Sequence, residues 1–139
     1  MDPEKLIKEI EKTVYGFEKE VLKEAQEHLQ NQVRKLFQTE GRSLKVHWEP
    51  VKPDYLEWKL RKGYSEKTLH RTTTLAQSFH GKVEEERLIF GTPVKYALFH
   101  EYGTSKMPAR PIFQPLFKDL TENIDDLVEA VAEDLFGRR

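Results

Sequence analysis

Apolar residues recur at steps of three and four along the first quarter of the chain. They are Ile7, Ile10, Val14, Phe17, Val21, Ala25, Leu29, Val33 and Leu36. This spacing predicts an amphipathic helix over residues 4–38. Asp2 and Pro3 suit its start, because Asp caps well and proline is tolerated in a first turn. A helix this long extends past a small sheet, so its far half either packs on another subunit or spans the chain's own core.

A second apolar line near the C-terminus predicts another amphipathic helix over residues 115–136. Pro115 suits its first turn, and Gly137 is a favourable residue just past its end. From Asp119 to Asp134 the chain has seven acidic residues and no basic ones. This charge predicts either a solvated face or a docking surface for a basic neighbour, with Asp125, Asp126 and Glu129 as candidate contacts.

Between these helices, residues 44–111 show shorter patterns. Alternation of Leu44, Val46 and Trp48 with polar residues predicts a short strand. Residues 55–62 are expected to form a helix that Asp54 caps and Gly63 ends.

Residues 79–85 and 87–92 read as the two strands of a hairpin. The whole pattern predicts one α+β domain over residues 1–139. In it, long N-terminal and C-terminal helices pack on a small, mostly antiparallel sheet.

The stretch from Val94 to Phe113 is the most distinctive in the chain. Tyr96, Phe99 and Tyr102 fall three apart and predict an aromatic face on a short helix that ends at Gly103. Such a stripe usually belongs to a core. Arg110 stands between two prolines, so we expect an extended backbone there and an outward side chain.

The loop after Gly103 has two interpretations. It is either a connector that sets the entry of the last helix, or a stiff docking loop presenting Lys106, Met107 and Arg110.

Composition narrows the function classes. The formal net charge is −1, which disfavours a general nucleic-acid binder, and the chain has no cysteine for a thiolate zinc site. His100-Glu101 begins like a zinc-protease motif, but no second histidine follows at the required spacing. We therefore expect no enzyme activity, no metal and no cofactor. No apolar run is long enough for a signal peptide or a membrane helix, so no membrane association is expected.

Nucleic-acid binding is the rival interpretation. Residues 44–71 hold seven Lys or Arg against four Asp or Glu, a difference of +3. Within segment 52–71, Tyr55, Trp58 and Tyr64 lie among these cations, and aromatic rings interleaved with cations can stack bases and pair with phosphates. The same residues are also ordinary for a core helix face with exposed lysines.

Two blocks of the sequence resemble a family of small tail-assembly proteins from long-tailed bacteriophages, called virion morphogenesis, tail-completion or minor tail proteins. The first block has Tyr96-Ala97, Glu101-Tyr102, Gly103-Thr104 and then Pro108-Ala109-Arg110-Pro111. The second runs from Trp48 to Phe79. It departs from the family pattern at Thr73-Thr74-Leu75, where Thr-Gly-x-Leu is frequent.

The resemblance implies a non-enzymatic structural protein of the phage or prophage tail or neck, acting in tail completion or head–tail joining. It implies self-association, commonly as a hexameric ring, and docking to tail-tube, connector or neck proteins. It also implies a place in the virion after assembly in the cytoplasm of a bacterial host. The candidate interface residues are Tyr96, Glu101, Tyr102, Gly103, Thr104, Lys106, Met107, Arg110, Pro111, Asp125, Asp126 and Glu129.

Overall fold

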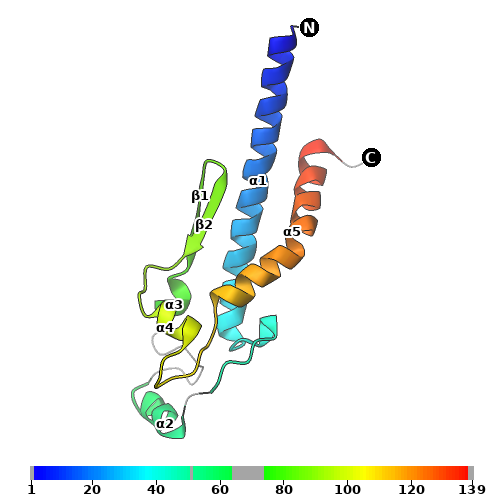
Figure 1. Ribbon diagram of the computed structural model, residues 1–139. Coiled ribbons are helices and arrows are strands. Elements are labelled where there is room, and N and C mark those ends of the chain that lie inside the picture. The colour runs from blue at the N-terminus through cyan, green and yellow to red at the C-terminus, as the bar shows by residue number, and fades with distance from the viewer. Residues whose placement is uncertain (1, 51, 64–73, 138–139) are drawn as a thin grey trace.

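A computed structural model describes residues 2–50, 52–63 and 74–137 of the chain. The first helix, α1 (Pro3–Gln38), confirms the predicted N-terminal helix. It begins where an Asp2 carboxylate oxygen accepts a hydrogen bond from the backbone N–H of Glu4 at 3.1 Å. Its buried residues all lie in its second half, whereas residues 2–16 are exposed. Figure 1 shows that the N-terminal part of α1 extends beyond the other elements.

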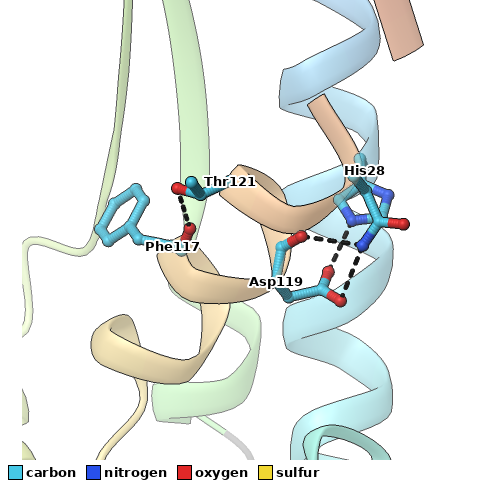
Figure 2. Close-up of polar contacts among 5 residues, drawn as sticks. His28, Phe117, Asp119 and Thr121 are labelled. Atoms are coloured by element: carbon cyan, nitrogen blue, oxygen red, sulfur yellow. Dashed lines mark hydrogen bonds and ion pairs between the residues drawn. The ribbon is translucent and has the colours of Figure 1, made fainter. Parts of the chain in front are cut away.

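The last helix, α5 (Phe113–Phe136), confirms the second amphipathic pattern and packs along α1. Leu116 and Val131 are buried. A polar contact reinforces this apolar packing, because His28 Nε2 of α1 lies 2.6 Å from Asp119 Oδ2 of α5 (Figure 2). Near the end of α5, the rings of Phe136 and Phe17 lie 5.8 Å apart. The α1–α5 contact therefore reaches about the middle of α1.

A two-stranded antiparallel hairpin, β1 (His80–Glu84) and β2 (Arg87–Gly91), confirms the predicted hairpin. It lies against α1, and a short helix, α3 (Thr74–Gln77), precedes it. Two glutamines of α1 hold it by side-chain hydrogen bonds, Gln26 to the carbonyl of Gly81 at 3.1 Å and Gln30 to that of Phe79 at 2.8 Å. The predicted α+β class is confirmed.

The prediction of a strand over Leu44–Trp48 is wrong. A 3₁₀ turn, η1 (Arg42–Leu44), follows α1, and Lys45 has φ of +58°, a left-handed conformation that a regular strand does not contain. The following residues run as irregular chain. Trp48 is nevertheless buried, as the alternation implied, because its ring packs against Phe37 of α1 rather than on a sheet.

The helix predicted over residues 55–62 is present as α2 (Pro53–Arg61), which begins two residues earlier. Lys52 occupies the cap position and Pro53 the first turn, so Asp54 lies inside the first turn rather than capping it. Its carboxylate is still favourable there, because a helix N-terminus attracts negative charge. Gly63 follows the helix with φ of +80°, as its predicted role at the helix end requires.

The core gathers around the C-terminal end of α1. The Phe37 ring lies 5.4 Å from that of Trp48 and 5.8 Å from that of Phe79. Leu29, Leu36, Ile112 and Leu116 complete the most deeply buried layer, each fully shielded from solvent. Segments from both ends of the sequence therefore build one core.

Candidate assembly interface

Helix α4 (Ala97–Tyr102) carries the aromatic stripe on its outer side. Tyr96, Phe99 and Tyr102 are 44%, 56% and 79% exposed, so the expectation that they belong to the core is wrong. The inward positions are instead Ala97 and Glu101, one turn apart, which are 2% and 9% exposed. A small residue lets the helix approach the core closely, and this turns the rings outward. We call Tyr96, Leu98, Phe99 and Tyr102 the α4 patch.

Glu101 is a candidate interface residue that the structure places inside the fold. One carboxylate oxygen accepts hydrogen bonds from the backbone N–H groups of Ile112 and Phe113, both at 2.7 Å. The other accepts from the N–H of Gln114 at 3.2 Å. These donors belong to the start of α5, which has no side-chain cap of its own. Glu101 therefore caps α5 from another helix.

Arg110 does not point outward as expected, because its side chain is buried and only 7% exposed. Its Nε donates to the carbonyl of Glu49 at 2.7 Å, and its backbone N–H donates to the carbonyl of His100 at 2.6 Å. Burial lowers the pKa of the guanidinium, while Glu49 and Tyr55 partly oppose that shift. The arginine thus ties the loop to the chain that follows Trp48, as the connector interpretation predicts.

Pro111 completes this network, since its carbonyl accepts a hydrogen bond from Trp48 Nε1 at 2.9 Å. Sequence reasoning missed the set of contacts made by Glu101, Arg110 and Trp48, although all three belong to the resemblance blocks. We call this set the buried clasp. It joins α4, the loop after it, the start of α5 and the irregular segment after η1.

The loop after α4 makes a tight turn. Gly103 has φ of +72° and ψ of 174°, a region essentially restricted to glycine. A Cβ atom there would lie 2.7 Å from the backbone nitrogen of Ala109. Thr104 and Met107 then pair as an antiparallel bridge, and the Thr104 hydroxyl accepts from the N–H of Lys106 at 3.2 Å. Lys106 is exposed at the tip.

His100 lies beside the clasp, and its burial predicts that the stability of the fold depends on pH. Among the described residues, its Nδ1 is buried without a hydrogen-bond partner. Desolvation, followed by the nearby Arg110 charge, lowers the pKa of His100 below its ordinary value of about 6.5. The unfolded chain therefore binds this proton more readily, and the stability that the neutral imidazole allows falls as pH drops below the ordinary pKa.

We therefore expect His100→Gln to lose less stability than the wild-type chain between pH 7.5 and about 5. Urea unfolding at several pH values measures this, and the difference between the two proteins removes the contribution of other titrating groups. His80→Gln, on an exposed side chain, is the matched control. Parallel pH curves for wild type and His100→Gln would contradict the prediction.

The charged candidates remain on the surface. Asp125, Asp126 and Glu129 of α5 are exposed. In the basic segment, Lys59 is buried with its Nζ 5.8 Å from the centre of the Tyr55 ring. Tyr64 and the rest of the segment up to Arg71 lie outside the described residues. A contact between acidic helix and basic segment stays a prediction.

The nucleic-acid interpretation gains no support from α2. The rings of Tyr55 and Trp58 stack on one another with centroids 5.6 Å apart, and the Trp58 side chain is half-buried.

Within the described residues, no helix is long and apolar enough to cross a membrane. The described residues also hold no group of three or more His, Cys, Asp or Glu side chains that could bind a metal ion together.

Comparison with known proteins agrees with the resemblance. "Uncharacterized protein MJ0331" of Methanocaldococcus jannaschii is 30% identical over 139 residues, covering 94% of this chain and 96% of the relative. No solved structure gives a significant match. The profile of the phage virion morphogenesis family matches residues 4–133, which include α4, the loop and the clasp. The chain therefore belongs to the phage virion morphogenesis family and has a structural role in phage assembly.

Proposed function

We propose that this protein is a non-enzymatic structural component of a phage tail or neck that acts in tail completion or head–tail joining. It works by associating with itself and by docking to tail-tube, connector or neck proteins. Family membership supports the structural role. The single observation that carries the docking mechanism is the α4 patch, an apolar surface presented on a short helix that the clasp holds in place.

The α4 patch has the properties of a prepared interface. Three of its four side chains are aromatic, a residue type enriched at protein contacts, and all four are exposed. Contiguous exposed apolar surface usually marks an interaction site. The clasp orders the helix and the following loop before any partner binds, which reduces the entropy lost on docking. Assembly of a virion uses each of these features.

A complementation experiment tests this function. Deletion of the gene is expected to leave heads and tails that do not join into infectious particles, and the wild-type gene should restore them. A Phe99→Ser, Tyr102→Ser variant should fold, because substitutions at exposed sites typically change stability by less than about 0.5 kcal/mol. We expect it to restore few or no infectious particles, as measured by plaque titre and electron microscopy.

Ile89→Ser on β2 is the control, since that side chain is 48% exposed but lies outside the patch. It should complement as well as the wild-type gene. Joined, infectious particles in the deletion strain would contradict the proposed function. Full rescue by the α4 variant would instead show that docking uses another surface.

A further inference from the structure

The projecting N-terminal part of α1 has an apolar side on which no other segment that the structure describes is packed. Leu6, Ile7, Ile10 and Val14 are 45–55% exposed. They recur at three- and four-residue steps, so they share one side of the helix. We call residues 3–16 of α1 the arm, about 21 Å long at 1.5 Å per residue. A contiguous exposed stripe of this length indicates a surface that a partner covers.

Charges on the arm are sorted around this stripe. With about 100° between successive residues, Glu4 and Glu11 of the arm, and Glu18 just beyond it, follow one border of the apolar side. The lysines fall on the opposite side of the helix, away from the stripe, at Lys5, Lys8 and Lys12 of the arm and at Lys19 just beyond it. A surface that covers the stripe would therefore meet glutamates at its edge, and a basic rim would fit best.

Lysines flank the α4 patch along the chain. Lys95 precedes the patch and Lys106 follows it, and both are exposed. Glu101 is the one carboxylate between residues 93 and 111 of the sequence, and it is buried and bonded to the start of α5. The stretch that carries the patch is therefore apolar, and exposed positive charges flank it along the chain.

These two surfaces cannot meet within one molecule. Figure 1 shows the arm at one end of the structure and α4 towards the other end. Antiparallel pairing of two arms is disfavoured, because the glutamate borders of the two stripes would then face each other. The arm thus fits a different surface, on a different molecule.

We propose that the arm of one copy docks on the α4 patch of a second copy of this chain. The contact rests on the self-association in the proposed function and names the two surfaces that make it. Because the surfaces differ, the contact is head-to-tail, and a bound pair still presents one free arm on one copy and one free patch on the other. Repetition closes into a ring where the rotation between copies allows it.

Native mass spectrometry over a concentration series tests the contact with three variants of the full chain. The arm variant is Ile7→Ser with Ile10→Ser, and the patch variant is Phe99→Ser with Tyr102→Ser. The control is Lys8→Ser with Lys12→Ser on the opposite side of the arm. We expect the wild type and the control to form species larger than dimers, and the arm and patch variants each to remain monomeric.

Mixing the two defective variants gives the sharper result. The intact arm of the patch variant can bind the intact patch of the arm variant, but the remaining surfaces are both defective. An equimolar mixture should therefore form heterodimers and nothing larger. An arm–arm interface predicts the opposite, because the patch variant would then associate on its own and the mixture would gain nothing.

A charge exchange tests the rims. Glu11→Lys with Glu18→Lys, and Lys95→Glu with Lys106→Glu, should each weaken assembly at low salt. Their mixture should restore large species, because every contact in it pairs opposite rims. A wild-type chain that stays monomeric throughout, or that assembles independently of both surfaces, would overturn the contact. Rescue of infectious particles by that same chain would leave the proposed function standing.

Discussion

Glu101→Ala is expected to lower the free energy of unfolding by about 3–5 kcal/mol. The carboxylate accepts three backbone hydrogen bonds at the start of α5, at 2.7, 2.7 and 3.2 Å. Hydrogen bonds to a charged group are worth about 1.5–3 kcal/mol each, and their losses are not fully additive. Removing the acceptor also leaves buried N–H groups without partners and ends the favourable interaction with the helix dipole.

Chemical denaturation followed by tryptophan fluorescence measures this loss. Glu101→Gln keeps the shape and an acceptor oxygen but not the charge, so its loss should be smaller than that of the alanine variant. Glu129→Ala is the matched control, an exposed glutamate on α5 whose removal should change stability by less than about 0.5 kcal/mol. Equal stability of Glu101→Ala and wild type would show that Glu101 does not hold the start of α5.

Trp48→Ala is expected to cost a similar amount, about 3–5 kcal/mol. The side chain is 4% exposed, and its ring meets that of Phe37 edge-on at 5.4 Å. Alanine would leave a cavity beside the end of α1 and would also leave the carbonyl of Pro111 without the indole N–H. The irregular segment after η1 would lose its main attachment to the core.

Trp48→Phe separates the two contributions, since it keeps an aromatic ring and removes the hydrogen bond. Loss of the bond alone should cost about 1–3 kcal/mol, less than the loss of the whole ring. Urea unfolding curves followed by far-UV circular dichroism compare the three proteins without relying on the mutated tryptophan. Equal losses for the two variants would contradict the account, because ring packing would then contribute nothing.

The long elements could be predicted from the sequence because their apolar periodicity is sustained. Repeated steps of three and four over α1 and α5 leave little choice of structure. The alternation over Leu44–Trp48 covers only three apolar residues, which is too short a pattern to establish a strand. Alternation shows that Trp48 turns inward, but it does not show whether a neighbouring strand exists to pair with.

The clasp could not be predicted, because its partners are backbone groups distant in sequence. Nothing in the sequence near Glu101 shows that its carboxylate meets the N–H of Ile112, and nothing near Arg110 identifies the carbonyl of Glu49. The orientation of α4 had a weak indication in Ala97, whose small side chain permits close approach to the core. The aromatic residues of α4 indicated the opposite orientation more strongly, because large aromatic side chains are usually buried.

The packing of α1 against α5 also determines at what stage of its synthesis the protein can fold. His28 and Asp119 are separated by 91 positions, and the buried layer joins Leu29 to Leu116. Contacts between such distant positions form slowly, and during synthesis they must wait until the last helix has left the ribosome. The cap on α5 forms at the same late stage, so α4 acquires its fixed position only in a completed chain. Within one nascent chain, the arm therefore emerges before the patch has formed, and a molecule presents both surfaces only when its chain is complete.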